Sequence, residues 1–413
     1  MTLELSPSKR PCWCGSAVTE PYSPEYRFCP ACGSLVSQFG LNSDELRVRD
    51  DATDYYGKSY WQSHQTAELN LPSIEERAVH DLPRRCVHWL RHLLASCLPP
   101  ARVLELGCAH GAFVSLMRAA GYDAQGLEVS PWVVDFARKT FDVPILAGPL
   151  EEQALPDGSF DAIVLNDLLE HLDEPRLLIE HCVRLLKPTG LLFVQTPKFP
   201  DRPHAELLEA KMPFLEMMSP AIAREHLHLF SDRSARMLLE HAGLSVVEER
   251  PAAFVYDMYL VASRTEIPSF THEQVDNALR PKPSGRLVGG FLALDRLYGE
   301  SRLETQTARE QYEELRKVAH AEIDRLHDEW KKSRQQVVDV SMNLRAAETS
   351  WAAAEKLLYE EIARLRKFEF DEVIGPITRR VALRLARLER HVPFVHRFLK
   401  WMLRRSRPGS RAS

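Results

Sequence analysis

Between residues 101 and 264, short apolar runs alternate with stretches in which apolar residues recur every three or four positions. The runs at 103–106 and 162–165 have the length and composition of buried strands. The stretches 113–120 and 233–242 have the spacing of amphipathic helices, in which one face packs on a core. Because strands and helices alternate along the chain, we expect an α/β fold with helices on the faces of a sheet.

The second half of this region predicts further elements. Ser130 is a good cap for a helix over 131–140, because its hydroxyl can accept a hydrogen bond from a free backbone N–H of the first turn. Residues 197–224 are irregular and rich in proline and methionine, which indicates an insertion. The patterns at 245–249 and 254–262 predict two more strands.

The loop after the first strand carries the first candidate chemistry. That strand runs into Glu105, a turn follows at Gly107, Ala109 and Gly111, and the next strand ends on Glu128. Glycines let the backbone approach a ligand closely, and the following helix offers free N–H groups to an anionic group. An acid at the end of the second strand can accept both hydroxyls of a ribose. We therefore expect an adenosine cofactor here.

Glu105 narrows the choice of cofactor, because its carboxylate would repel a pyrophosphate but suits the ammonium of a methionine moiety. Together with the stretches 158–172 and 184–196, this pattern resembles the class I S-adenosylmethionine-dependent methyltransferases. The resemblance covers residues 101–263 and implies a Rossmann-like sheet with a reversed last strand.

The resemblance also implies further cofactor contacts. Leu150 and Glu151 follow the third strand, where this family places residues against adenine. Asn166 ends the fourth strand at the carboxyl edge of the sheet, where open α/β folds bind ligands. Ala109 stands where most relatives have glycine, which tightens the loop. His171 lies near a helix start, and a single histidine there is more often structural than catalytic.

Four cysteines crowd the first forty residues, namely Cys12, Cys14, Cys29 and Cys32. They form two short-spaced pairs, each followed by glycine, so that the turns can direct four sulfurs toward one centre. Such a set predicts a structural Zn²⁺ in a zinc ribbon over residues 1–40. Two disulfides are the alternative, which a reducing compartment disfavours.

An aromatic cluster at 54–61 follows the ribbon and precedes a helical pattern at about 74–94, and we treat 41–100 as a cap segment with its helix. Several sugar-modifying methyltransferases have a zinc ribbon and then a Tyr/Trp-rich segment that folds over the cofactor, and this chain resembles them. Tyr55, Tyr56 and Tyr60 could contact a sugar, or they could pack the ribbon onto the sheet.

The candidate catalytic residues are Glu225 and His226, which precede a helix capped by Ser231. In the sugar methyltransferases that this chain resembles, a Glu-His-x-x-x-Phe motif occurs at this point and ends here on Phe230. Neutral His226 could take the proton of an acceptor hydroxyl, while Glu225 could orient it or bind the sugar. The alternative is a histidine that only binds the acceptor or holds the loop. In an extended loop, His228 would point the opposite way.

The last third of the chain changes character. After an expected linker at 265–299, residues 312–365 lack proline and glycine and carry apolar residues at steps of three and four. This pattern predicts a coiled coil over 300–368, and hence a homo-oligomer.

The tail at 369–413 has an apolar stripe among arginines, and from Asp371 onward 11 Arg or Lys face 3 acidic residues. A basic amphipathic helix fits an anionic membrane surface, and a docking site on a glycan-assembly protein is the alternative. With a net charge of −5 overall, we expect no nucleic-acid partner.

Location and substrate follow from these parts. The chain has no long apolar run and no signal-peptide pattern, so we expect a cytoplasmic protein, peripheral on the inner face of the plasma membrane if the tail binds lipid. We expect methylation of a sugar hydroxyl on a cell-surface polysaccharide or its lipid-linked precursor. Two alternatives are C-methylation of a nucleotide-linked deoxysugar and a non-catalytic coiled-coil scaffold.

Overall fold

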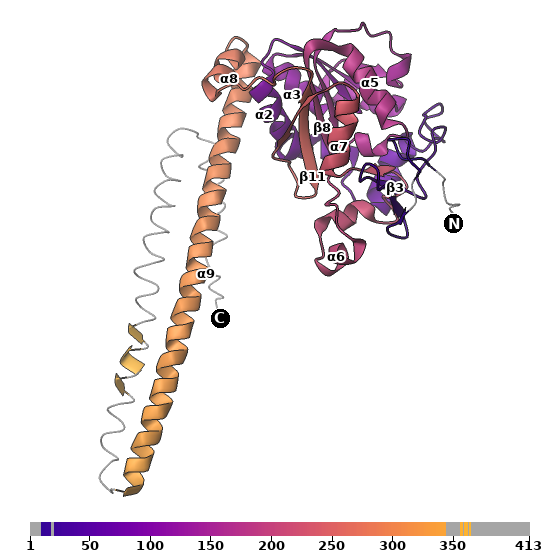
Figure 1. Cartoon of the computed structure of the whole chain (residues 1–413). Helices are drawn as coiled ribbons and strands as arrows, with labels where there is room; N and C mark the ends of the chain where they lie inside the picture. The colour runs from indigo at the N-terminus through magenta and orange to yellow at the C-terminus, as the bar shows by residue number, and fades with distance from the viewer. Residues whose placement is uncertain (1–9, 18–19, 344–355, 358, 362, 365–413) are drawn as a thin grey trace. The chain divides into compact units, whose positions relative to one another are not determined.

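The computed structural model describes residues 10–17, 20–343, 356–357, 359–361 and 363–364. The chain divides into two compact units, Met1–Ala293 and Leu294–Ser413. The first unit contains every candidate site residue. Figure 1 traces the chain from its N-terminus through the mixed α/β body to the long helix α9.

The core of the first unit is a mixed sheet, which within the described residues has seven strands in the order β10-β11-β8-β7-β4-β5-β6. Strands β4 to β8 run parallel, whereas β11 is antiparallel to both β8 and β10. The expected Rossmann-like sheet with its reversed strand is confirmed. The strands are β4 Arg102–Leu106, β5 Asp123–Glu128, β6 Ile145–Ala147, β7 Phe160–Asn166, β8 Leu186–Pro197, β10 Val246–Arg250 and β11 Asp257–Ser263.

Helices cover both faces of this sheet (Figure 1). One apolar cluster joins the sheet to α2, α3 and α4, and another joins it to α5 and α7. The predicted caps are present, because Ser130 accepts from the Val133 N–H and Ser231 from the Ser234 N–H. These helices are α2 Val87–Ser96, α3 Ala112–Ala120, α4 Pro131–Phe141, α5 Pro175–Leu185 and α7 Asp232–His241.

The N-terminal ribbon forms a second, small sheet with a strand from the middle of the chain. It comprises β1 Glu20–Pro21, β2 Tyr26–Phe28, β3 Leu35–Ser37 and β9 His228–Leu229, in that order. Cys12, Cys29 and Cys32 belong to the same apolar cluster as the sheet face under α5 and α7. The ribbon is therefore part of the core of the first unit.

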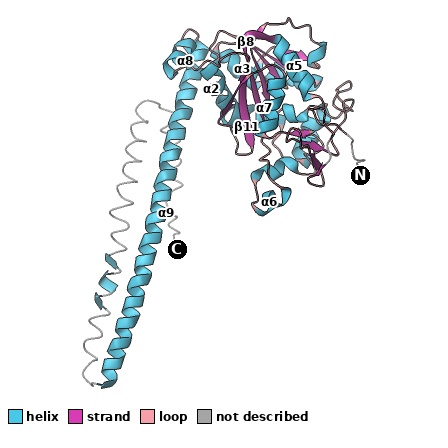
Figure 2. Ribbon diagram, in the orientation of Figure 1, coloured by secondary structure: helices cyan, strands magenta, loops and turns pink. Residues whose placement is uncertain are grey.

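The expected helix at 74–94 is present in three pieces, α1 Ile74–Asp81, a π-helical turn η2 Leu82–Cys86, and α2. Pro83 lies within the π turn, and its nitrogen has no hydrogen, so it cannot donate the ordinary helical hydrogen bond. Before it, η1 Tyr60–Glu68 is a second π-helical segment. The insertion contains α6 His204–Glu209 and the 3₁₀ segment η5 Pro213–Met218. Figure 2 shows helices and strands in separate colours.

Residues 265–299, which we expected to form a linker, are helical over most of their length. Helix α8 spans His272–Leu279, and α9 spans Pro283–Asn343. Thr271 and Gln274 form a reciprocal capping box that starts α8, and proline suits the first turn of α9. Each glycine inside a helix costs only about 1 kcal/mol, so the glycines of α9 do not end it.

In the second unit, α9 continues through the predicted coil to Asn343 and carries pairs such as Arg325 with Glu322 and Glu329. Leu303 and Val318 are exposed on it. Self-association of this helix stays a prediction, since the structure is of a single chain. Most of the coil after Asn343, and the tail at 369–413, lie outside the described residues. Among the described helices, none is long and apolar enough to cross a membrane.

Candidate active site and cysteine cluster

The loop between β4 and α3 has the close-approach geometry expected of a ligand cradle. Gly107 and Gly111 have φ of +65° and +79°, and Ala109 has φ of +46°. A Cβ added at Gly107 would lie 3.1 Å from the Leu168 side chain. Ala109 thus occupies a left-handed conformation that costs an alanine about 1–2 kcal/mol more than a right-handed one. The loop keeps this strained shape with an alanine in place of the usual glycine.

Glu128 is held at the end of β5 by backbone N–H groups. Its Oε2 accepts from Ala109 N at 3.1 Å, and its Oε1 accepts from Val129 N at 2.8 Å and Ser130 N at 3.1 Å. Burial raises the pKa of Glu128, and these backbone hydrogen bonds oppose the rise. A carboxylate has about four lone-pair sites, so one remains for a ligand hydroxyl. The sequence predicted an acid that accepts both ribose hydroxyls, whereas these bonds leave one acceptor site, and ribose binding by Glu128 stays a prediction.

Glu105 and Asn166 leave polar atoms without partners at the adjoining ends of β4 and β7. Within the described part of the chain, Glu105 Oε2 and both side-chain polar atoms of Asn166 are buried with no hydrogen bond. Burial raises the pKa of Glu105 to about 8. Buried polar atoms without partners are costly, so Glu105 Oε2 and Asn166 Oδ1 suit a ligand that brings N–H donors and positive charge, whereas Asn166 Nδ2 suits an acceptor. A methionine ammonium has both properties.

The remaining predicted cofactor contacts differ from each other. Leu150 begins the short 3₁₀ segment η3 Leu150–Glu152 and is buried in the apolar cluster of the sheet. Glu151 beside it is exposed. Leu150 thus adds to the apolar surface beside the sheet, whereas the Glu151 side chain is exposed to solvent. Contact of either residue with adenine stays a prediction.

The aromatic segment lies against the ligand edge of the sheet. Tyr60 and Trp61 form a cluster with Val133 of α4, and Ala109 of the cofactor loop packs on the same cluster. Asp51 accepts a hydrogen bond from the Ser130 hydroxyl at 2.9 Å, next to Glu128. We call residues 51–69 the cap. The cap thus packs beside the loop that carries Ala109 and beside Glu128, and its role over a bound cofactor, which the resemblance implies, stays a prediction.

Glu225 accepts hydrogen bonds from side chains of this cap. Its Oε1 accepts from the Tyr55 hydroxyl at 2.9 Å and from His64 Nε2 at 2.6 Å, and its Oε2 accepts from the Tyr60 hydroxyl at 2.7 Å. Burial opposes ionisation of Glu225, but the hydrogen bonds from His64 and Tyr60 and the nearby histidines lower its pKa below the usual value. Both carboxylate oxygens are thus engaged with the cap. The sequence did not single out His64, whose partner is 161 positions away.

His226 is buried beside Glu225 with a defined tautomer. Its Nδ1 lies 3.2 Å from the Met217 carbonyl oxygen, which can only accept, so Nδ1 carries the proton and Nε2 has the free lone pair. Burial lowers the pKa of His226 to about 3. The imidazole is therefore neutral at pH 7, as a proton acceptor must be.

His228 has a different environment. It lies in β9, where its Nε2 is 3.3 Å from the Asp173 carbonyl oxygen, and burial lowers its pKa to about 4. The two histidines therefore contact separate parts of the chain, one the insertion and the other the loop after β7.

Glu170, His171 and His226 each place a possible ligand atom within 4.8 Å of the others. His171 already has partners, the Tyr56 hydroxyl 3.2 Å from its Nδ1 and the backbone carbonyl of Glu225. Glu170 accepts from the Thr196 hydroxyl at 2.9 Å. We interpret this group as a hydrogen-bonded support for the loop that carries Glu225 and His226, since binding a metal would require these contacts to break. His171 then has the structural role expected of it.

The four N-terminal cysteines come together as predicted. Their Sγ atoms all lie within 4.8 Å of one another, with 3.4 Å from Cys12 to Cys32 and 3.7 Å from Cys14 to Cys29. A tetrahedral ion with Zn–S bonds of about 2.3 Å separates its sulfurs by about 3.8 Å, whereas a disulfide requires about 2.05 Å. The hydrogen bond from the Cys12 thiol lowers the pKa of Cys32 to about 5, which favours a thiolate. The cluster fits a structural Zn²⁺ and not two disulfides.

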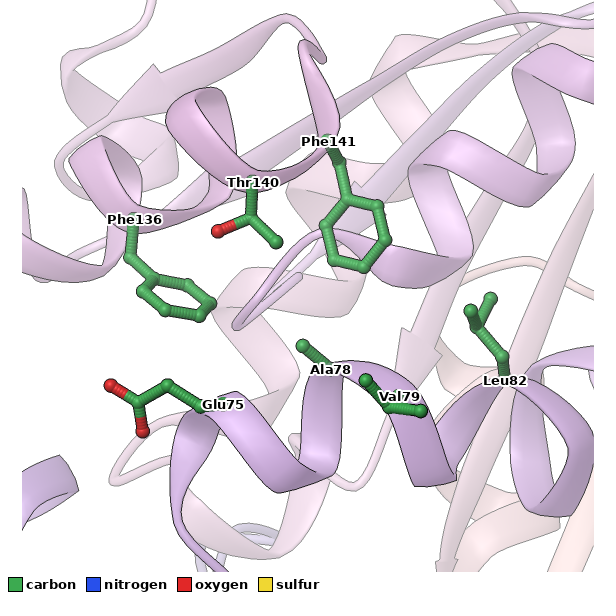
Figure 3. A pocket seen from close by; sticks show the side chains of 7 residues that line it. All are labelled: Glu75, Ala78, Val79, Leu82, Phe136, Thr140 and Phe141. Carbon is green, nitrogen blue, oxygen red and sulfur yellow. The ribbon is translucent and has the colours of Figure 1, made fainter.

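A separate pocket of about 310 Å³ lies between α1 and α4 (Figure 3). Its walls are mainly apolar side chains. It contains none of the predicted site residues, which places it outside the cofactor edge. The lining residues are Glu75, Ala78, Val79, Leu82, Phe136, Thr140 and Phe141.

Several known proteins are similar to this chain in sequence or structure. Residues 78–249 match the model of a family described as methyltransferase domain. This match covers less than half of the chain. The chain is 35% identical over 105 residues to the ubiquinone biosynthesis O-methyltransferase of Xanthomonas campestris, covering 24% of this chain and 44% of that protein. The Bordetella avium protein of the same name is 30% identical over 131 residues, covering 30% and 54%.

The chain thus spans about half the length of the curated relatives it matches. Among solved structures, it is similar to an S-adenosylmethionine-dependent methyltransferase from Archaeoglobus fulgidus, with 17% identity, a TM-score of 0.36, and coverage of 46% of this chain and 97% of that one. A corresponding enzyme from Aquifex aeolicus gives 18% identity, a TM-score of 0.35, and coverage of 46% and 95%. The residues that match the family model include the loop after β4, Glu105, Glu128, Asn166 and the Glu225-His226 pair.

Proposed function

We propose that this protein transfers a methyl group from S-adenosylmethionine to a hydroxyl group of a sugar. The observation that carries the proposal is the arrangement at the ends of β4, β5 and β7. There, unpartnered Glu105 and Asn166 suit an ammonium, and Glu128 retains an acceptor site for a ribose hydroxyl. When bound, this cofactor would supply an electrophilic methyl group on a positively charged sulfur.

His226 is the residue that we assign to proton removal. As the acceptor oxygen forms its bond to the methyl carbon, its O–H bond breaks and the proton moves to His226 Nε2. Burial lowers the pKa of His226 to about 3, so the imidazole is a weak base, and we assign proton removal to the stage at which methylation makes the acceptor hydroxyl acidic. His226 gains positive charge as the sulfur loses it, so the net charge of the site stays constant. Glu225 is ionised beside it and stabilises that charge.

The sugar acceptor rests on the arrangement of ribbon, tyrosine-rich cap and Glu-His pair, which is similar to that of sugar methyltransferases. The curated relatives carry the name O-methyltransferase, which favours oxygen over carbon as the acceptor atom. We extend the proposal to a cell-surface polysaccharide or its lipid-linked precursor, with self-association through α9 and a tail that binds an anionic membrane or a glycan-assembly protein. These partners would place the enzyme on the inner face of the plasma membrane.

A product assay tests the chemistry. The full-length protein is incubated with methyl-labelled S-adenosylmethionine and a panel of sugar nucleotides and oligosaccharides, and the methylated product is examined by proton NMR. A methyl group on oxygen supports the proposal. A methyl group on ring carbon assigns the same His226 to removal of a carbon-bound proton, and transfer to a non-sugar hydroxyl alone refutes the sugar acceptor. His226→Ala is the inactive control, with retained cofactor binding.

A further inference from the structure

We propose that the cysteine ribbon positions the catalytic loop, so that metal in the cysteine cluster controls where His226 lies. We call residues 223–229 the catalytic loop. The proposal rests on the proposed function only for the role of His226, because the position of the loop can be measured without methyl transfer. Tyr26 is the positioning residue that we assign.

The ribbon holds almost every residue of the catalytic loop by its backbone. Strand β3 pairs with β9, with Leu35 opposite Leu229 and Val36 opposite His228. Ser37 follows Val36 in β3, and its backbone N–H donates at 3.0 Å to the carbonyl of Leu227, the residue before β9.

The contacts continue toward the insertion. The Ser37 hydroxyl donates to the Ala223 carbonyl at 2.5 Å, and Leu41 N donates to the Arg224 carbonyl at 3.0 Å. These bonds hold the residues on either side of Glu225 and His226. Each of them comes from the ribbon or the residues just after it.

Tyr26 makes the most direct contact. Its side chain is fully buried in the apolar cluster between the ribbon and the insertion, and its hydroxyl donates to the backbone carbonyl of His226 at 3.1 Å. The Met217 carbonyl meanwhile accepts from the His226 ring. The backbone carbonyl of His226 is thus held by the ribbon, while its backbone N–H, which donates to the Ile222 carbonyl at 2.9 Å, and its ring are held by the insertion.

The cysteine cluster is joined directly to these strands. Cys29 follows β2, which contains Tyr26, and its N–H donates to the Ser34 carbonyl at 2.9 Å just before β3. Cys29 and Cys32 therefore close the turn that connects β2 to β3. Strands of three residues are too short to be stable alone, and an ion bound by four sulfurs would supply the missing stability.

The direct support of the cofactor residues Glu105 and Glu128 comes from outside the ribbon. Glu128 is held by Ala109, Val129 and Ser130, and Glu105 lies in β4 of the central sheet. Loss of metal should therefore release the catalytic loop and leave cofactor binding in place. A ribbon that only stabilised the whole domain would change both together.

Hydrogen–deuterium exchange on the full-length protein tests this separation. Tyr26→Phe removes one buried hydrogen bond and keeps the ring, so exchange in peptides covering 223–229 should rise roughly fivefold. Tyr22→Phe is the matched control, since its hydroxyl donates at 2.6 Å to the Arg202 carbonyl, outside the catalytic loop. Exchange at 123–128 and the Kd for S-adenosylmethionine should stay unchanged in both variants.

Metal removal gives the stronger perturbation. Chelation of the folded protein, or Cys29→Ser, should raise exchange across 223–229 by tenfold or more and lower kcat, while the Kd for S-adenosylmethionine stays within twofold. Unchanged exchange in both Tyr26→Phe and the metal-free protein would overturn the proposal, as would equal loosening at 123–128. If Cys29→Ser does not fold, Tyr26→Phe decides alone. Failure of the unmodified protein to bind S-adenosylmethionine would refute the proposed function, but not the link between ribbon and loop.

Discussion

Glu225 should hold the cap closed, and we call the set of hydrogen bonds that it accepts from the cap the latch. Glu225→Gln tests it, because glutamine has nearly the same shape as glutamate. The carboxylate accepts from Tyr55, Tyr60 and His64, whereas glutamine has one acceptor oxygen and must present its NH₂ to at least one of these donors. Hydrogen bonds to a charged group contribute about 1.5–3 kcal/mol, and neutral ones about 0.5–1.5 kcal/mol. Loss of one bond and weakening of the others should therefore cost cap closure about 2–4 kcal/mol.

Limited trypsin digestion at Lys58, which is exposed within the cap, measures this opening. If cleavage requires the cap to open, a cost of 2–4 kcal/mol should accelerate it by roughly 30-fold or more. Glu68→Gln is the matched control, because Glu68 also pairs with His64 but is exposed, and exposed pairs contribute about 0–1 kcal/mol. Wild-type cleavage in Glu225→Gln, or equal acceleration in Glu68→Gln, would refute the latch.

The latch should also depend on pH. The hydrogen bond to Glu225 raises the pKa of His64, so the contribution of His64 is complete below about pH 6.5 and is lost as the pH rises through its folded-state value. The pKa of Glu225 is lowered, so its contribution is present above about pH 4.5 and is lost as the pH falls through the folded-state value. Cleavage at Lys58 should therefore accelerate as the pH rises above neutral, and this acceleration should be absent in His64→Gln.

Three further predictions concern the metal, the base and the cofactor loop. Purified protein should contain one zinc per chain by elemental analysis, and Cys29→Ser should release it; absence of zinc together with oxidised cysteines would favour disulfides instead. His226→Ala should lower kcat about 100-fold or more, the scale of losing a general base, with His228→Ala costing less; equal losses would remove His226 from the base role. Ala109→Gly should relieve the strain of the left-handed conformation and raise the free energy of unfolding by up to about 1 kcal/mol. Thermal unfolding measures this change, and a lower Tm would contradict the claim that Ala109 is strained.

Local patterns predicted the central sheet and its cofactor loop well. Strand length, helix caps and the positions of Glu105 and Glu128 depend on residues close together in sequence, and each is where the pattern indicated. Residues 265–299 are rich in Pro and Gly, which favours a linker, but the capping box of Thr271 and Gln274 starts a helix there.

The sequence pattern did not predict contacts between residues that are far apart in the chain. Nothing in the pattern indicates that Leu35 pairs with Leu229, or that Glu225 accepts from Tyr55 and His64. Glu225 was predicted to orient His226 or bind a sugar, whereas both its oxygens engage the cap. Burial of His226 was equally hidden, because it arises from packing of the ribbon and the insertion around the loop.

Calorimetric titration with S-adenosylmethionine tests the central claim most directly. At pH 7, the raised pKa of about 8 leaves Glu105 mostly protonated, and a bound ammonium should lower that pKa. Binding should thus release close to one proton, seen as a dependence of the heat on the ionisation enthalpy of the buffer, and Glu105→Gln should abolish the release. Glu128→Ala should weaken binding by about 1.5–3 kcal/mol. Binding of NAD in place of S-adenosylmethionine, or binding that is indifferent to both substitutions, would contradict the account.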